Sequence, residues 1–437
     1  MKIFLSNLGC VRNRVDGELM LGRLAAAGHE IVDDPETAGV IVVNTCGFID
    51  SAADESIDTI LSLAEFKSEG DCERLIVTGC LSQRYGPDSA EAMPEVDVFL
   101  GTGSYNRIED AINGKCMPDN LFADPDALPL QNAHSPRVIE KGPTAYLKVT
   151  EGCNRRCTYC IIPKLRGRLR SRPKEDVVAE ARMLAESGFS EIIIIGQDTT
   201  SYGRDLDKAC DFADLLDAIA DAASPAWVRF LYGHPDGISA ALLQTMANHA
   251  NICPYLDVPV QHASDRILKK MGRTGNCTKL HELFENIRSS LPGAAVRTTF
   301  MVGFPGETDR DFKELMEFAE KIKFENLGAF IYSDGEDLPS HGLENHVPAK
   351  TAEKRHALLM KKQAEISRKI NEARIGKTYA VLVEESLEPG LYSGRTMFQA
   401  PEVDGLTFID AVDLTPGEFA DVRITDAFEY DLKGVPA

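Results

Sequence analysis

Short apolar runs rich in β-branched residues alternate with amphipathic stretches along most of the chain. In the first region, the runs predicted as strands are Lys2–Leu8, Val40–Asn44, Leu75–Thr78 and Val96–Leu100. The stretch Ser51–Phe66 has helical periodicity, with Asp50 or Ser51 as its expected N-cap. Strands that alternate with helices favour a parallel sheet covered on both faces, so we predict a doubly wound α/β domain.

A second series of strand and helix patterns begins at Thr144. Before it, prolines recur between Lys115 and Pro143 without periodicity, which is typical of a linker. The predicted strands of the second series are Ala145–Thr150, Glu191–Ile195, Trp227–Tyr232, Tyr255–Val260, Ala295–Val302 and Leu327–Tyr332. Six such units are too few for the eight-stranded closed barrel, so we expect an open (β/α)6 partial barrel.

The last region has a different pattern. A polar helix is predicted over Lys350–Ile375, and the short runs Tyr379–Val383, Leu406–Asp410 and Phe419–Ile424 follow between turn signals. Such a pattern predicts a small all-β barrel. The predicted organisation is an N-terminal domain over 1–114, a linker over 115–142, a core over 143–370 and a barrel over 371–437.

Composition narrows the class of protein. The 437 residues are 43% apolar and 26% charged, which is ordinary for a globular chain. No apolar run approaches the roughly 20 residues of a membrane span, and no secretory signal is recognisable, so we expect a cytoplasmic protein. The net charge of −21 argues against broad nucleic-acid binding. Eleven cysteines without a secretion signal indicate reduced thiols used for metal binding or catalysis.

Cys153-x-x-x-Cys157-x-x-Cys160 is the strongest chemical signal in the chain. Three thiolates are one short of the four that fill a 4Fe-4S cluster, so one iron would stay open for a small molecule. The loop follows a predicted strand at its carboxyl end, where ligand sites of α/β folds lie. The alternative is a structural zinc loop, but no fourth Cys or His lies at the spacing that zinc sites use.

Cys10, Cys46 and Cys80 form a second set, because each one ends a predicted strand. They are separated by 36 and 34 residues, close to one βαβ unit each. All three thiols are therefore expected at one edge of a parallel sheet. Gly9, Gly47 and Gly79 beside them would let the backbone approach a bulky cluster. By spacing alone, three ordinary buried cysteines are the alternative.

The first cysteine set resembles the signature of the radical S-adenosylmethionine superfamily, and the whole chain resembles the methylthiotransferase family within it. That resemblance implies a three-cysteine N-terminal domain, a radical core and a C-terminal TRAM-like barrel. It implies that Cys10, Cys46 and Cys80 bind an auxiliary 4Fe-4S cluster and that Cys153, Cys157 and Cys160 bind the radical cluster. One S-adenosylmethionine would then methylate a sulfur at the auxiliary cluster, and a second would be cleaved to a radical that activates the substrate carbon.

Within the family, the chain is most similar to the branch that modifies an aspartate β-carbon in protein twelve of the small ribosomal subunit. The segments that carry this resemblance are Leu8-Gly9-Cys10-x-x-Asn13-x-Val15-Asp16, Asn44-Thr45-Cys46-Gly47-Phe48-Ile49-Asp50-Ser51-Ala52, Glu151-Gly152-Cys153-Asn154-x-x-Cys157, Cys160-Ile161-Ile162-Pro163, Gln197-Asp198-Thr199-Thr200, Val258-Pro259-Val260-Gln261-His262 and Arg395-Thr396-x-x-Gln399-Ala400-Pro401-Glu402-Val403-Asp404-Gly405. The resemblance implies that ribosomal protein as substrate, free or in the assembled subunit, and an electron donor such as flavodoxin or ferredoxin.

The charge of the barrel supports a protein substrate independently. From Asn371 onward the chain holds 5 Lys or Arg and 13 Asp or Glu, a net charge of −8. A barrel that grips tRNA should be basic, whereas an acidic barrel suits a basic ribosomal protein. The alternatives are a tRNA methylthiotransferase, an electron-transfer iron–sulfur protein and a pure interaction module. An acidic barrel that only confers solubility is also compatible with this charge.

Other residues at predicted strand ends are candidates for S-adenosylmethionine contacts. They are Gly196, Gln197, Asp198, Gln261 and Gly303. We assign no general acid or base, because hydrogen abstraction by a radical needs none. The basic loop from Lys164 to Lys174 could touch ribosomal RNA or an acidic reductase, or be a solvated loop. The remaining cysteines are predicted to be structural: Cys72, Cys116, Cys210, Cys253 and Cys277.

Overall fold

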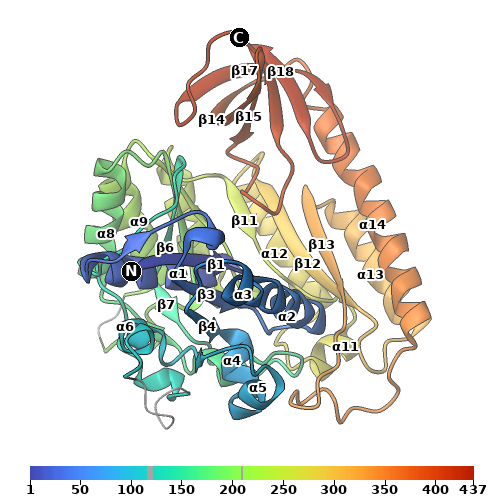
Figure 1. Cartoon of the computed structure of the whole chain (residues 1–437). Coiled ribbons are helices and arrows are strands. Elements are labelled where there is room, and N and C mark those ends of the chain that lie inside the picture. The colour runs from blue at the N-terminus through green and yellow to red at the C-terminus, as the bar shows by residue number, and fades with distance from the viewer. Residues whose placement is uncertain (116–121, 208–209) are drawn as a thin grey trace. The chain divides into compact units, whose positions relative to one another are not determined.

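The computed structural model describes residues 1–115, 122–207 and 210–437 (Figure 1). The chain divides into two compact units. Unit 1 comprises Met1–Glu140, Thr150–Arg155 and Ile161–Arg172, and unit 2 comprises Lys141–Val149, Arg156–Cys160 and Pro173–Ala437. In the parts of the chain that the structure describes, we find no helix that is both long and apolar enough to cross a membrane.

Unit 1 is built on a parallel sheet with strand order β2-β1-β3-β4-β5. Its strands are β1 (Lys2–Asn7), β2 (Glu30–Ile31), β3 (Val40–Thr45), β4 (Arg74–Gly79) and β5 (Val98–Leu100). Its helices are α1 (Val11–Ala26), α2 (Asp50–Ala64), α3 (Phe66–Glu69), α4 (Cys80–Tyr85), α5 (Pro87–Ala92), α6 (Ile108–Ile112) and α7 (Ile162–Arg166). All six residues of β3 are buried, as expected for a central strand covered on both faces. The predicted N-terminal parallel sheet is thus confirmed.

Two local predictions in unit 1 differ from the structure. The two-residue strand β2 gives too short an apolar run to be recognised in the sequence. Helix α2 begins at Asp50 itself, with Ile49 in the N-cap position and no side-chain cap, so the predicted capping by Asp50 or Ser51 is wrong. Asp50 instead lies in the first turn, where a carboxylate interacts favourably with the helix dipole.

Residues 122–140, which fall in the predicted linker, belong to unit 1. Val138 N donates to Glu18 O at 3.0 Å, and the Arg137 guanidinium contacts the Glu18 carboxylate at 2.5 Å, both side chains being buried. A Cβ added to Gly22 would lie 2.2 Å from Pro136 O, so this strap runs directly along helix α1. The rest of the predicted linker includes residues 116–121, Cys116 among them, which lie outside the described residues.

The core of unit 2 has six strands, in the orders β10-β9-β6 and β11-β12-β13. They are β6 (Thr144–Lys148), β9 (Glu191–Ile195), β10 (Trp227–Phe230), β11 (Tyr255–Asp257), β12 (Ala295–Val302) and β13 (Asn326–Ile331). Between them lie α8 (Lys174–Glu186), α9 (Phe212–Ala223), α10 (Ala240–Asn248), α11 (Asp265–Lys270), α12 (Cys277–Ser290) and α13 (Asp309–Ile322). The parallel bridge from Val228 to Ile252 and the bond from Gly233 N to Asp257 O, 2.9 Å, join the two halves. The open six-stranded arrangement is confirmed.

The long helix α14 (Ala349–Glu372) leads along β13 into a closed barrel with strand order β14-β15-β16-β18-β17 (Figure 1). Its strands are β14 (Thr378–Glu388), β15 (Leu391–Thr396), β16 (Thr407–Asp410), β17 (Phe419–Ala427) and β18 (Leu432–Pro436). The predicted small all-β barrel is confirmed, but β15 and β18 were missed. Each contains a glycine that resembles a turn signal, yet Gly394 is needed because an added Cβ would lie 2.4 Å from Leu382 O.

Candidate functional site

Cys10, Cys46 and Cys80 all lie at the carboxyl edge of the sheet in unit 1. Cys10 precedes α1, Cys46 directly follows β3, and Cys80 is the first residue of α4. The strands pair in parallel register, with Asn7 opposite Asn44, so neighbouring strands end at the same level. Cys10 is the N-cap residue of α1 and Cys80 is the first residue of α4, so these two thiols stand at helix N-termini. The positive end of a helix dipole favours a thiolate.

Glycines make the close approach of these loops possible. Gly9 has φ +86°, and a Cβ there would lie 2.7 Å from Cys46 Cβ and 3.0 Å from Cys46 Sγ. Gly79 has φ +100°, and its Cβ would lie 2.5 Å from Thr45 O. Any other residue at either position would be strained and would push the neighbouring loop away. The backbone around Cys10, Cys46 and Cys80 is thus shaped to bring one loop against the next.

The three thiols are electrostatically coupled to one another and to Arg166. Burial raises the pKa of the Cys80 thiol to about 11. The neighbouring Cys10 and Cys46 add to this rise, whereas the positive charge of Arg166 opposes it. Burial also raises the pKa of Cys46. Burial acts against ionisation of Cys10 as well, but Arg12 and Arg166 outweigh it and hold the pKa of that thiol below its ordinary value. The site therefore contains fixed positive charge suited to thiolate ligands.

The donor set is three cysteines, the residue type that holds iron–sulfur clusters. Among the described residues, no group of three or more His, Cys, Asp or Glu side chains could hold one metal ion. A 4Fe-4S cluster binds each thiolate through a different iron, so its ligands need not converge on one point. Three cysteines on adjacent strand ends, with glycines beside them, suit the auxiliary cluster that the sequence resemblance implies.

Cys153, Cys157 and Cys160 lie on one loop of the chain, between β7 (Thr150–Glu151) and α7. In unit 1, Cys153 N donates to Gly167 O at 3.1 Å. Gly152 has φ +76°, and a Cβ there would lie 1.9 Å from Arg168 O, so only glycine permits this approach. Cys153 is therefore held in place by Gly167 and Arg168, which follow Cys160 in the chain.

The rest of the cysteine loop is fixed within unit 2. Thr158 N donates to Met271 O at 3.0 Å. Arg273 reaches the same loop, because Nη1 donates to Tyr159 OH at 3.0 Å while Nη2 donates to Pro259 O at 2.6 Å. Burial raises the pKa of Tyr159, so its hydroxyl stays protonated between Cys157 and Cys160. Neither Tyr159 nor Arg273 was identified from the sequence, because their role depends on a distant pairing.

Gly196, Gln197 and Asp198 follow β9 at its carboxyl end, as predicted. The Asp198 carboxylate accepts hydrogen bonds from Thr200 Oγ1 at 2.9 Å and from Ser201 Oγ at 2.6 Å. Thr200 Oγ1 in turn accepts from His234 N at 3.1 Å. Asp198 therefore orders the turn after β9 and, through Thr200, ties it to the turn after β10. This gives a rigid strand-end edge of the kind that binds ligands in α/β folds.

Gln261 and Gly303 lie at the ends of the next strands. Gln261 has φ +70°, and its backbone bridges β12 through Thr299 O at 2.8 Å and Met301 N at 2.7 Å. Gly303 has φ +77°, and a Cβ there would lie 2.6 Å from Ala352 Cβ. The Gly303 amide donates to the Glu307 carboxylate. Gly303 can therefore shape a cofactor site by lacking a side chain. Its amide already donates to Glu307, so it is not a donor for a cofactor.

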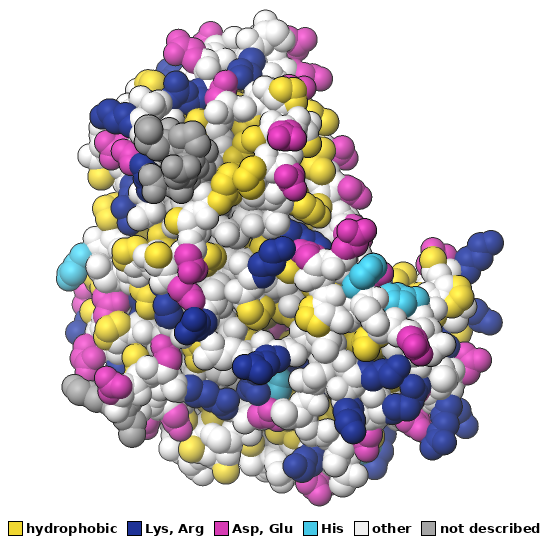
Figure 2. Space-filling model, turned by 90° about the horizontal axis from the view of Figure 1, so that it is seen from below, with side chains coloured by type: hydrophobic (Ala, Val, Ile, Leu, Met, Phe, Trp, Pro, Cys, Tyr) yellow, Lys and Arg dark blue, Asp and Glu magenta, His cyan; other side chains and the backbone are white. Residues whose placement is uncertain are grey.

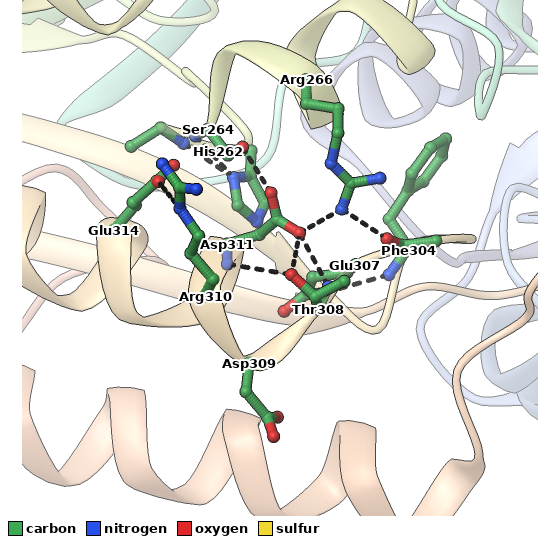
Figure 3. Close-up of polar contacts among 12 residues, drawn as sticks. His262, Ser264, Arg266, Phe304, Glu307, Thr308, Asp309, Arg310, Asp311 and Glu314 are labelled. Carbon is green, nitrogen blue, oxygen red and sulfur yellow. Dashed lines mark hydrogen bonds and ion pairs between the residues drawn. The ribbon is translucent and has the colours of Figure 1, made fainter.

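A cluster of polar contacts, drawn in Figure 3, links the segment from His262 to Arg266 with the start of α13. His262 Nδ1 accepts the backbone amides of Ala263 and Ser264, both at 2.9 Å, and burial lowers the pKa of His262 to about 3. Asp311 accepts from Ser264 Oγ at 2.6 Å and from Thr308 N at 2.8 Å, which closes the capping box of α13. The segment after Gln261 is thus anchored to the start of α13.

The basic loop after the cysteines is mostly an internal element of unit 1. Arg166 and Arg172 are buried, and Arg170 donates to backbone carbonyls of Pro125 and Leu128 at 2.8 Å and 2.5 Å. Of the four arginines in the loop, Arg168 is the exposed one, with 85% of its side chain accessible. Because Arg166 and Arg172 are buried, the expectation of a solvated or RNA-contacting loop is wrong for these two side chains. Arginine-rich composition alone does not reveal burial, which depends on partners elsewhere in the fold.

The barrel motif that begins at Arg395 also makes internal contacts. The Asp404 carboxylate accepts from Tyr255 OH at 2.7 Å and from Ala400 N at 2.8 Å. Gln399 Oε1 accepts from Thr396 N and Thr407 Oγ1 at 3.0 and 2.8 Å. Within unit 2, the Asp404–Tyr255 bond joins the barrel to the core, whereas the Gln399 bonds order the barrel itself.

Comparison with protein families gives three matches along the chain. Residues 2–101 match the uncharacterized protein family UPF0004, residues 147–319 the radical SAM superfamily, and residues 375–436 the TRAM domain. Each match lies inside one of the ranges predicted from sequence for the N-terminal domain, the core and the barrel.

Several curated proteins are similar over nearly the whole chain. The "Ribosomal protein uS12 methylthiotransferase RimO" of Desulfosudis oleivorans is 51% identical and covers 99% of both chains. The protein of the same name from Clostridioides difficile is 46% identical, covering 99% of this chain and 98% of its own. Among solved structures, the radical S-adenosylmethionine methyltransferase TsrM from Kitasatospora setae has a TM-score of 0.54 and 14% identity, covering 90% of this chain and 78% of that one. That structural likeness supports the fold alone.

Proposed function

Because the chain belongs to the ribosomal protein uS12 methylthiotransferase family, we propose that it attaches a methylthio group to the β-carbon of an aspartate in ribosomal protein uS12. The observation that carries this proposal is the 51% identity to a relative of that name over 99% of both chains. The chain is a radical S-adenosylmethionine enzyme, and its cofactors are S-adenosylmethionine and 4Fe-4S clusters.

The residues that hold these cofactors are part of the proposal. Cys10, Cys46 and Cys80 are assigned to the auxiliary cluster, and their placement on adjacent strand ends beside Gly9 and Gly79 supports this. Cys153, Cys157 and Cys160 are assigned to the radical cluster by their spacing. When bound, the clusters and S-adenosylmethionine supply the radical and the sulfur chemistry that no side chain can provide.

The protein's own residues then have holding and positioning roles. Gly196, Gln197, Asp198, Gln261 and Gly303 are proposed to line the S-adenosylmethionine site at the carboxyl edge of the core. The bonds of Asp198 to Thr200 and Ser201 support this, because they fix the turn at one strand end. A rigid edge holds a small ligand at a defined distance from the reacting atoms. No acid or base is assigned.

The substrate and partners follow from charge and family. The barrel carries −8, which suits the basic surface of a ribosomal protein better than tRNA. Lys and Arg side chains nevertheless recur over the face drawn in Figure 2, so the net charge of −21 does not describe every surface. We propose that the enzyme acts in the cytoplasm on uS12, free or in the assembled small subunit, with flavodoxin or ferredoxin as electron donor.

The direct test is the peptide mass of uS12 after incubation with anaerobically reconstituted enzyme, a reductant, sulfide and S-adenosylmethionine. We expect a methylthio mass shift on one aspartate that is absent with Cys157→Ala. The matched control is Cys72→Ala, because Cys72 is buried among apolar side chains of unit 1 and belongs to neither cysteine set. A shift found on tRNA instead of uS12, with intact S-adenosylmethionine cleavage, would replace the proposed substrate with the tRNA alternative.

A further inference from the structure

Arg166 places a permanent positive charge against one of the proposed cluster ligands. It is the last residue of α7, and only 4% of its side chain is exposed. Its Nη2 atom lies 3.6 Å from Cys80 Sγ, within hydrogen-bond range of a sulfur acceptor. A guanidinium stays protonated at every physiological pH, so this is a charge-assisted N–H···S bond.

The direction of this guanidinium is fixed by helix α1. Arg166 Nη1 forms an ion pair with the Asp16 carboxylate, and Nη2 donates to Asn13 Oδ1 at 3.0 Å. Asn13 Nδ2 donates to Leu8 O at 2.8 Å and to Thr45 O at 3.2 Å. Asn13 therefore ties Arg166 to the strand ends that lead into Cys10 and Cys46.

The burial of Arg166 needs an explanation beyond stability. A buried ion pair is weak evidence for stabilisation, because desolvation of both charges offsets their attraction. Neutralising Asp16 would require only Nη1, whereas Nη2 is directed toward Asn13 and Cys80. Glu151 adds a second carboxylate 3.7 Å from Nη1, which helps to hold the charge in the interior.

Hydrogen bonds to ligand sulfur and nearby positive charge stabilise the reduced form of an iron–sulfur cluster, which carries one more negative charge. We propose that Arg166 is a positioning residue that raises the reduction potential of the cluster held by Cys10, Cys46 and Cys80. When the cluster is bound, Arg166 would favour its one-electron reduction, in which a flavodoxin or ferredoxin donor is oxidised by one electron and no bond in Arg166 is made or broken. This inference rests on the assignment of that cluster in the proposed function.

The test uses the full chain with Cys153, Cys157 and Cys160 replaced by alanine, so that the auxiliary cluster is the only one present. Its midpoint potential is measured by dithionite titration with electron paramagnetic resonance detection. In this background, Arg166→Gln is expected to bind the same iron but to destabilise the reduced cluster about tenfold or more, a shift of about 59 mV to lower potential for one electron.

The matched control is Arg168→Gln, which removes the same charge from the same loop. Arg168 is 85% exposed and pairs with Asp126, so its loss is expected to leave the potential unchanged. Arg166→Lys keeps the charge but not the planar fork, and a smaller shift in the same direction is expected.

Equal midpoint potentials in the parent, Arg166→Gln and Arg168→Gln proteins would overturn the proposed role of Arg166 and leave the proposed function unaffected. Folded chains in which both Arg166 variants bind no iron would assign Arg166 to cluster retention and overturn its role in the potential. Absence of iron from the parent triple-alanine variant would count against the cluster assignment itself, and the proposed function would have to change with it.

Discussion

Arg395 in barrel strand β15 donates from Nη2 to Glu191 Oε2 in core strand β9 at 2.6 Å, with both side chains fully buried. Arg229 donates from Nε to the other carboxylate oxygen of Glu191 at 2.7 Å. Burial opposes ionisation of Glu191, but Arg395 and Arg229 outweigh it and hold the pKa of Glu191 at about 2. One buried carboxylate thus joins the barrel to the core within unit 2.

Removing Arg395 should weaken this junction strongly. Arg395→Met is expected to lose about 3–5 kcal/mol of stability, because Glu191 is left with less compensation for its burial. Trp227, the single tryptophan, has its ring centroid 4.7 Å from that of Phe419 in β17, so its fluorescence during urea unfolding reports on the junction. Lys433→Met is the control: its exposed ion pair with Asp410 should contribute about 1 kcal/mol or less. Equal losses in both variants would contradict a special role for the buried pair.

The two cysteine sets should lose iron independently. Cys46→Ala is expected to lose about half of the iron per chain while S-adenosylmethionine cleavage with dithionite is retained, because the radical cluster has its own ligands. Iron content and 5′-deoxyadenosine formation measure the two effects. Cys253→Ala, at a buried position on the amino side of β11, should keep all the iron. Loss of cleavage together with iron in Cys46→Ala would argue that the sites are not separate.

Gly303 should tolerate no side chain, for two separable reasons. An alanine there would adopt φ +77°, and its Cβ would overlap Ala352 Cβ at 2.6 Å. Gly293 has a similar φ of +84° but no atom within 4 Å of the added Cβ, so Gly293→Ala isolates the backbone strain of about 1–2 kcal/mol. Gly303→Ala is expected to cost about 1–3 kcal/mol more by overpacking and to weaken S-adenosylmethionine binding. Unfolding and equilibrium binding measurements on both variants separate these terms.

His262 should make the enzyme less stable in mild acid. Its pKa is lowered by burial from 6.5 to about 3, so the unfolded chain takes up a proton before the folded chain does. Stability from this residue is therefore complete above pH 6.5 and falls as the pH drops through that value toward 3. Between about pH 8 and pH 5.5 the expected loss is about 1.4 kcal/mol.

Urea unfolding at the two pH values checks this expectation. His262→Asn keeps an acceptor for the Ser264 amide and should remove most of that pH dependence. His134→Asn is the control, because His134 is an exposed residue of unit 1 and its loss should leave the pH dependence unchanged. The same pH dependence in wild type and His262→Asn would contradict a neutral buried His262.

Much of the arrangement could be predicted from the sequence, because it depends on local periodicity. The alternation of strands and helices predicts the parallel sheet, and the intervals between Cys10, Cys46 and Cys80 place these residues on successive strand ends. The structure puts them there. Strands β15 and β18 were missed because Gly394 and Gly434 serve close backbone contact there rather than a turn. That distinction depends on neighbours far along the chain.

The sequence by itself determined the three kinds of domain and their order, the placing of Cys10, Cys46 and Cys80 at strand ends, and the family, since each depends on periodicity, spacing or residue identity. Only the tertiary structure decided which charged groups are buried. Arg166 lies in a loop that reads as basic and solvated, yet it is buried because Asp16 and Asn13, some 150 residues away, meet it in unit 1. The desolvation cost of a charge is compensated only by partners brought close in space, and the sequence of the loop does not record them.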